Sequence, residues 1–269
     1  MSKMKSMVIY LFLNFCAFDC VVHSKKHQFI SDCHYDGSAE RGKYPLTFIC
    51  NENLGERNFF VNTLHYCTGQ SDFDNYNIGS INFKNCELSK IASNFFKIYK
   101  NVFELNMSNL GVETLQPESF KSGTQLMKLS ASHNKITEIP ADLLIEAVNL
   151  NTLDLSNNQI SRFDPNAFSL GNSLKYLYLE SNNISELSAE MFNELTELEY
   201  VDVSYNQVTK IPANLFDECK QLLNFNCSYN KINHFGPDIF PASNLLNILD
   251  LSHNNISELH VSTFQTLTE

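Results

Sequence analysis

Apolar residues return every 24 positions along most of this chain. In residues 126–149, LMKLSASHNKITEIPADLLIEAVN, apolar residues occupy positions 1, 4, 6, 11, 14 and 19 of the unit, and asparagine occupies position 9. The same frame starts again at Leu150, Leu174, Leu198, Leu222 and Leu246, and in a weaker form earlier, at Val102 and Ile78. The six positions are apolar in all eight copies. Eight copies in one frame predict a solenoid, in which each copy forms one turn.

Each 24-residue copy predicts one short strand followed by an irregular return limb. Positions 4 and 6 are apolar while positions 3, 5 and 7 are mostly polar, which is the alternation of a strand with one buried face. Equal copies stack these strands into a parallel sheet. Prolines at position 15 or 16 of several copies favour an irregular limb over a long helix. Because the limb is wider than a strand, the stack curves and the sheet lines its concave side.

Position 9 predicts a ladder of buried asparagines. Its members are Asn134, Asn158, Asn182, Asn206, Asn230 and Asn254. An amide that points into the solenoid can satisfy backbone groups of adjacent turns with its two N–H donors and its oxygen. Leu110 occupies position 9 of an earlier copy, so we expect the ladder to begin at Asn134.

The chain before the repeats falls into two parts. Residues 1–24 predict a signal peptide, because lysines precede an apolar run over 7–18 that is too short to span a bilayer. Small residues there allow cleavage after Ser24. Residues 25–77 lie outside the frame and predict an N-terminal cap over the first open edge of the solenoid. The repeats then occupy residues 78–269, and the eighth copy is incomplete.

The signal peptide predicts a secreted protein, in which disulfides are permitted. A Cys33–Cys50 bridge in the cap is the first choice and a Cys67–Cys86 bridge the second, although four cysteines allow three connectivities. Cys86 weakens the second pair, because it stands at position 9 of the first copy, where a small buried thiol can replace asparagine. The strand-like segments of the cap are residues 44–50 and 58–66.

The chain ends inside the eighth copy, with no cysteine-rich cap and no apolar stretch long enough to cross a membrane after it. An open end of a solenoid exposes an apolar face to water. We therefore expect this sequence to be a fragment of a longer protein. In that case it would lie on the extracellular face of the plasma membrane or in the extracellular space.

The frame L-x-x-L-x-L-x-x-N-x-I is the leucine-rich repeat, and LDLSNNQI and LDLSHNNI resemble its extracellular form. The first copies, INFKNCELSKIASNFF and FELNMSNLGVETLQPESF, resemble the opening repeats of insect leucine-rich immune proteins and Toll-like ectodomains. The resemblance implies an α/β repeat solenoid, a leucine-rich repeat horseshoe with a parallel concave sheet, irregular convex limbs and an N-terminal disulfide cap. It also implies protein recognition in innate immunity or signalling, with protein ligands or another leucine-rich repeat chain as partners.

Motifs for enzyme chemistry are missing: no nucleophile elbow, zinc-protease motif, phosphate-binding glycine loop or C-x-x-C occurs. Asp154, Asp202 and Asp250 stand at position 5 of alternate copies, about 9–10 Å apart at two strand spacings. That separation excludes a shared proton or a single calcium ion, so we expect no catalytic residue, metal or cofactor. The net charge of −11 argues against nucleic acid as a partner.

The exposed positions of the concave strands predict a ligand-binding face. Its candidate residues are Tyr176, Tyr178, Glu180, Tyr200, Asp202, Tyr205 and Tyr229. Tyrosine buries a large area at interfaces and keeps a hydrogen-bonding tip. The first three tyrosines carry the prediction, because position 8, where Tyr205 and Tyr229 stand, tolerates many residues. Recognition of a protein ligand is the leading interpretation, and adhesion, a membrane-tethered receptor ectodomain or enzyme inhibition are the alternatives.

Four N-glycosylation sequons occur, at Asn106, Asn183, Asn226 and Asn255. Asn183 and Asn255 follow the ladder asparagine at position 10 and are the stronger candidates. Asn106 and Asn226 fall at position 5 of the concave strands. A glycan at Asn226 would obstruct the tyrosine face.

Overall fold

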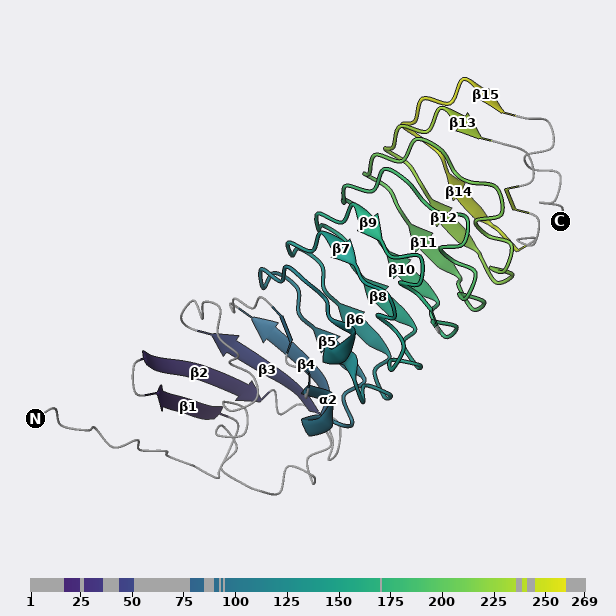
Figure 1. Cartoon of the computed structure of the whole chain (residues 1–269). Helices are drawn as coiled ribbons and strands as arrows, with labels where there is room; N and C mark the ends of the chain where they lie inside the picture. Colours follow the sequence, from purple (N-terminus) through teal and green to yellow (C-terminus); the bar gives the residue numbers. More distant parts are fainter. Residues whose placement is uncertain are drawn as a thin grey trace, which may run out of the picture.

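The eight copies form one parallel sheet (Figure 1). The computed structural model describes residues 17–24, 27–35, 44–50, 78–84, 90–91, 93, 95–169, 171–235, 239–240 and 245–259. The strands of the copies are β4 (Ile78–Lys84), β5 (Glu104–Asn106), β6 (Lys128–Ser130), β8 (Thr152–Asp154), β10 (Tyr176–Tyr178), β11 (Tyr200–Asp202), β12 (Asn224–Asn226) and β14 (Ile248–Asp250). Each pairs with the next one copy further on, so that Leu153 lies opposite Leu177 and Leu177 opposite Val201. The predicted solenoid with a parallel sheet is confirmed.

Three further strands extend this sheet at its N-terminal edge. β1 (Ala17–Ser24), β2 (His27–Tyr35) and β3 (Tyr44–Cys50) pair antiparallel with one another, and β3 pairs parallel with β4. β3 coincides with the strand expected at residues 44–50, whereas residues 58–66 lie outside the described residues. β1 falls within the predicted signal peptide, so the boundary after Ser24 stays a prediction.

The cysteine pairing in the cap also stays a prediction. Cys33 lies on β2 and Cys50 ends β3, and only the backbone of these strands is described. Cys67 and Cys86 lie outside the described residues.

The return limbs are irregular, as the prolines predict. In the part of the chain that the structure describes, the helices are the single turns α2 (Phe95–Ile98) and η2 (Pro117–Phe120), and neither is long and apolar enough to cross a bilayer. Positions 13 and 14 add two small parallel sheets that the sequence did not predict. They pair β7 (Glu138–Ile139) with β9 (Arg162–Phe163), and β13 (His234–Phe235) with β15 (Glu258–Leu259). In Figure 1 these lie apart from the main sheet, on the opposite side of the coils.

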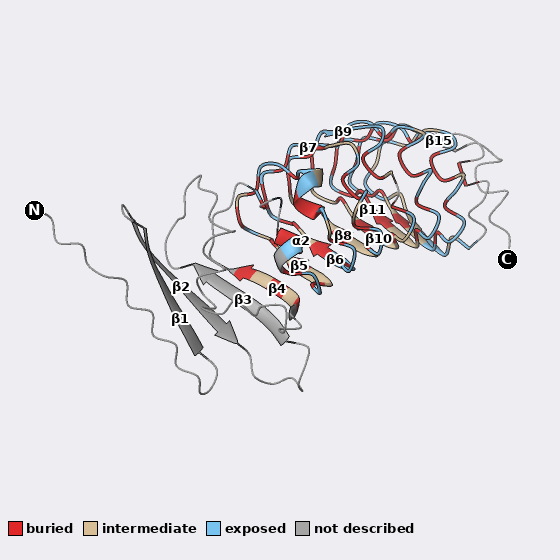
Figure 2. Cartoon of the chain, turned by 60° about the horizontal axis from the view of Figure 1, so that its bottom comes forward, coloured by how far each residue is buried: buried red, intermediate tan, exposed pale blue. Residues whose placement is uncertain are grey.

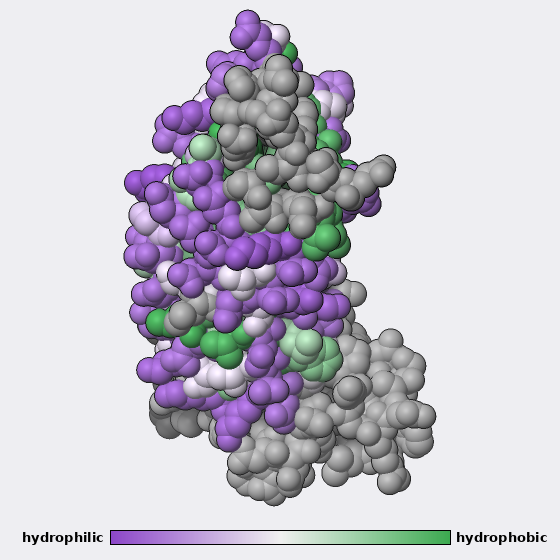
Figure 3. Space-filling model, turned by 90° about the vertical axis from the view of Figure 1, so that its right-hand side faces the viewer, coloured by the Kyte–Doolittle hydropathy of each residue, from purple (hydrophilic) through white to green (hydrophobic). Residues whose placement is uncertain are grey.

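Buried residues form a continuous layer between the strands and the return limbs (Figure 2). Leu129, Leu153 and Leu177 at position 4 are at most 1% exposed, and Leu110 at position 9 is buried as well. On the limb side, a column of rings fills position 19: Phe120, Phe168, Phe192, Phe216 and Phe240. From the second ring to the last, neighbouring centroids are 5.6–6.4 Å apart. The face in Figure 3 is largely hydrophilic with small separate apolar groups.

Two cysteines within the repeats serve as small apolar residues. Cys219 and Cys227 are both fully buried. Their thiols lie 3.6 Å from the Phe192 carbonyl and 3.5 Å from the Asp250 carbonyl, respectively. Burial raises the pKa of the Cys219 thiol to about 12 and also raises the pKa of Cys227. Both thiols therefore remain protonated and unreactive.

The position-9 amides join each coil to the preceding one. Asn182 shows the pattern: its Nδ2 donates to the carbonyls of Leu155 and Leu179 at 3.0 Å, and its Oδ1 accepts from the Ile160 amide at 2.9 Å. Leu155 and Ile160 belong to the preceding copy, and Leu179 to the same copy. The equivalent bonds are made by Asn134, Asn158, Asn206, Asn230 and Asn254. The side chains thus replace backbone pairing where the strand ends.

We expect Asn182→Leu to lower the free energy of unfolding by at least about 2 kcal/mol, since each buried peptide group left unpaired costs about 1–3 kcal/mol. Urea denaturation followed by circular dichroism measures the change. Asn193→Leu, at an exposed limb position, is the matched control and should change stability by less than about 0.5 kcal/mol. Equal effects of the two substitutions would contradict the role of the ladder.

Candidate ligand-binding face

The concave strands end in a repeated turn that position 5 stabilises. Asp154 Oδ1 accepts a hydrogen bond from the Ser156 amide at 3.0 Å, and Asp202 Oδ1 accepts one from the Ser204 amide at 2.8 Å. The same bond is made by Asn106, Asn226 and Asp250. An aspartate or asparagine that binds the amide two residues on forms an Asx turn. The position-5 carboxylates are therefore structural, a role that the sequence interpretation missed.

One copy departs from this turn at both positions. Tyr178 replaces the Asx residue at position 5, and Glu180 stands at position 7. Position 7 is serine in the other copies from the second onward: Ser108, Ser132, Ser156, Ser204, Ser228 and Ser252. Glu180 Oε2 is buried and has no hydrogen-bond partner, and the nearby Ser156 hydroxyl donates to Asp154 Oδ1 at 2.7 Å. Together, the residues at positions 5 and 7 place a carboxyl with a partnerless oxygen, that of Glu180, near the ring of Tyr178.

The Glu180 carboxyl binds a proton more readily than an exposed glutamate does. Burial raises its pKa from the ordinary value of 4.5 to about 7. The bond to its own amide opposes this shift, whereas the carboxylates of Asp202 on β11 and Asp154 on β8 add to it, and the Ser156 hydroxyl lowers the pKa slightly. At neutral pH the side chain therefore changes charge readily.

Tyrosines from two neighbouring strands lie near the Glu180 carboxyl. The rings of Tyr178 on β10 and Tyr200 on β11 have centroids 5.1 Å apart and are tilted by 40°. The Tyr200 hydroxyl donates to Asp202 Oδ2 at 3.1 Å. Burial, together with neighbouring carboxylates, raises the pKa of both phenols. Tyr176 stands at the start of β10 and is 36% exposed. We call Tyr176, Tyr178, Glu180, Tyr200 and Asp202 the concave patch.

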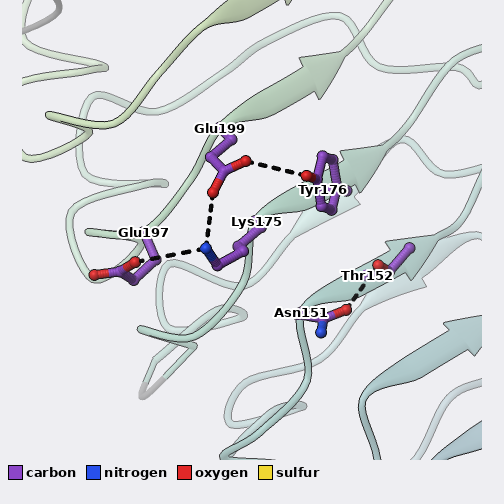
Figure 4. Close-up of polar contacts among 6 residues, drawn as sticks. All are labelled: Asn151, Thr152, Lys175, Tyr176, Glu197 and Glu199. Atoms are coloured by element: carbon purple, nitrogen blue, oxygen red, sulfur yellow. Dashed lines mark hydrogen bonds and ion pairs between the residues drawn. The ribbon is translucent and has the colours of Figure 1, made fainter.

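An ion pair borders the concave patch at position 2 (Figure 4). Lys175 Nζ lies 2.8 Å from Glu199 Oε1 and 3.9 Å from Glu197 Oε2. The Tyr176 hydroxyl donates to Glu199 Oε2 at 3.0 Å. The hydrogen bond and ion pair with Glu199 raise the pKa of Lys175. The same hydrogen bond lowers the pKa of Glu199. The cation next to the patch is thus already paired within the chain.

The other two predicted tyrosines belong to a separate group. Position 8 has a left-handed backbone throughout, with φ between 53° and 61° at Asn109, His133, Asn157, Ser181, Tyr205, Tyr229 and His253. There the rings of Tyr205 and Tyr229 stack at 4.2 Å, and those of Tyr229 and His253 at 3.9 Å. We call Tyr205, Tyr229 and His253 the edge stack. Tyr205 is 54% and Tyr229 42% exposed, and sequence reasoning did not include His253.

The sequon asparagines differ in their surroundings. Asn183 and Asn255 are exposed at position 10. Asn226 lies between its neighbours: its Nδ2 donates to Asp202 Oδ2 at 2.8 Å and its Oδ1 accepts from the Ser228 amide at 3.0 Å. A glycan on Asn226 Nδ2 would stand directly beside the bond to Asp202. Modification of any of the four asparagines, Asn106 included, stays a prediction.

A family model described as leucine rich repeat matches residues 100–160, 124–184, 172–232 and 196–256, more than half of the chain in all. The chain belongs to the leucine-rich repeat family. No curated protein sequence matches it.

Two solved structures have the same fold as this leucine-rich repeat protein. A chain in the crystal structure of the complex of Toll-like receptor 13 with ssRNA13 has 24% identity and a TM-score of 0.69, over 72% of this chain and 28% of that one. A chain of the Toll–Spatzle complex of Drosophila has 22% identity and a TM-score of 0.63, over 72% and 31%. The predicted likeness to Toll-like ectodomains is confirmed at the level of the fold. This chain spans less than a third of either relative.

We expect Glu180→Gln to stabilise the protein in alkaline but not in acid solution. The folded pKa of about 7 exceeds the ordinary 4.5, so folding carries a penalty that is complete above pH 7 and disappears as the pH falls to 4.5. Allowing for solvent screening, the penalty is about 1–2 kcal/mol. Urea denaturation at pH 8 and pH 4.5 measures the difference between the variant and the wild type. A difference independent of pH would contradict the raised pKa.

Proposed function

We propose that this leucine-rich repeat protein is an extracellular recognition module that binds a protein ligand on the concave patch. The departure of Tyr178 and Glu180 from the repeated Asx turn carries the proposal. Five position-5 side chains accept the bond of the Asx turn, and Ser130 donates to Asp154 instead, but Tyr178 and Glu180 do not form this turn. Residues that leave a structural frame and present aromatic and charged groups together are typical of a binding surface.

The fold relatives support recognition as the class of function. One relative was solved in a complex with ssRNA13, and the other in the Toll–Spatzle complex of development and innate immunity. For this chain we favour a protein ligand over nucleic acid, because its net charge is −11 and phosphates would be repelled. A role in innate immunity or signalling, with a secreted or cell-surface location, follows from the predicted signal peptide and the fold.

We propose no enzymatic activity. Among the described residues, no group of three or more histidine, cysteine, aspartate or glutamate side chains could hold a metal ion. The two buried thiols are protonated, which leaves them without nucleophilic reactivity. Leucine-rich repeat ectodomains of the Toll type are recognition modules.

Site-specific photo-crosslinking tests the location of binding. The full chain is secreted with p-benzoylphenylalanine in place of Tyr200 on β11, or in place of Asn193 on the return limb as the matched control, and is irradiated in extracellular fluid of the source organism. We expect a discrete covalent protein adduct at position 200 and none at position 193. An adduct at 193 alone, or at neither position, would count against the concave patch.

A further inference from the structure

We propose that the concave patch receives a positively charged segment of the protein ligand, with an arginine side chain between the Glu180 carboxyl and the rings of Tyr178 and Tyr200. This inference rests on the proposed function and adds the chemistry of the partner. Three features of the patch support it: its charge, the state of its carboxyls and its rings.

From β8 to β14 the concave strands carry negative charge without a cation at positions 3, 5 and 7, and Lys128 stands at position 3 of the preceding strand, β6. Positions 3, 5 and 7 of the five copies from Thr152 to Ser252 hold four acidic residues and no lysine or arginine. The acidic residues are Asp154, Glu180, Asp202 and Asp250. Lys175 at the border is already 2.8 Å from Glu199. A neutral or acidic partner would remove these carboxylates from water without a counter-charge, whereas a basic partner supplies one.

Among the carboxyls of Asp154, Glu180 and Asp202, that of Glu180 has an oxygen without a hydrogen-bond partner. Both oxygens of Asp154 and both of Asp202 accept hydrogen bonds from serine, asparagine or tyrosine groups of the solenoid. Glu180 Oε2 is buried without a partner, although the side chain as a whole is only partly buried. A guanidinium bound beside this carboxyl would compensate a charge that neither water nor the fold satisfies.

The tyrosine rings favour arginine over lysine as the guest. The Tyr178 and Tyr200 centroids lie 5.1 Å apart. Burial first, and then the carboxyls of Glu180 and Asp202, raise the pKa of both phenols. A guanidinium stacks on an aromatic ring and can form paired bonds with a carboxylate, and an ammonium does neither equally well. The patch therefore presents the two groups that arginine recognition uses.

Peptide binding to the full chain tests the partner chemistry. We expect a fluorescent octa-arginine peptide to bind the wild type at low salt, with octa-lysine weaker and octa-glutamate not bound. Glu180→Gln should raise the Kd by about 10-fold, and Tyr200→Leu by about 5-fold, while Tyr200→Phe keeps the ring and changes it less than about 2-fold. Glu194→Gln, exposed in the same copy, is the matched control and should change the Kd less than about 2-fold.

The pH dependence of the same binding gives a second readout. The guest needs ionised Glu180, so the wild-type Kd should be about 10-fold higher at pH 6 than at pH 8, given a free pKa of about 7. Asp154, Asp202, Tyr178 and Tyr200 face Glu180 from the three strands and stay in place in Glu180→Gln. This variant should therefore lose the pH dependence, and a circular dichroism spectrum like that of the wild type establishes that it is folded.

Two results would overturn the inference. One is equal octa-arginine affinity of the wild type and Glu180→Gln at pH 8, and the other is tighter binding of single-stranded RNA than of octa-arginine. If either occurs while the protein adduct at position 200 persists, the partner chemistry is wrong and the proposed function stands. If the adduct is absent as well, both fail.

Discussion

The side-chain amide of the position-9 asparagine holds the solenoid together. Where each strand ends, the chain turns into the interior and leaves backbone groups without strand partners. Asn182 and its equivalents satisfy groups of their own coil and of the preceding one. A leucine offers neither donor nor acceptor at this position, and a serine hydroxyl offers only one donor, on a shorter side chain. The amide, with two donors and an acceptor, therefore fixes both the turn and the spacing between coils. The parallel sheet and the Phe column then stack in the same register.

A fixed register makes surface variation informative. In most copies the position-5 side chain forms an internal hydrogen bond and position 7 is serine. A copy that departs from the pattern at both positions is therefore conspicuous. Tyr178 and Glu180 do so, and Tyr200 on the neighbouring strand completes the group. Glu180 lowers stability at neutral pH through its raised pKa, and we attribute that cost to binding.

The period of 24 residues was sufficient to predict the strands, their parallel order, the irregular limbs and the positions of the ladder. It predicted these because each depends on apolar spacing. The left-handed backbone at Tyr205 and the pairing of β7 with β9 depend instead on hydrogen bonds between copies, and the Asx turn at Asp202 depends on one within its own copy. Apolar spacing encodes neither kind of bond. A signal for the turn was present, since serine recurs at position 7 except at Glu180. The state of that carboxyl required the three-dimensional neighbours.

Hydrogen exchange at single-residue resolution tests the central role of the asparagine amides most directly. The amides of Ile136, Ile160, Ile184 and Val208 lie outside the main strands, and each donates to an asparagine Oδ1 at 2.9–3.1 Å. The account predicts that these four amides exchange as slowly as the amides of the concave strands. Their exchange rates should be at least about 1,000-fold lower than in an unstructured peptide. Exchange of these amides at the rate of unstructured peptide would contradict it.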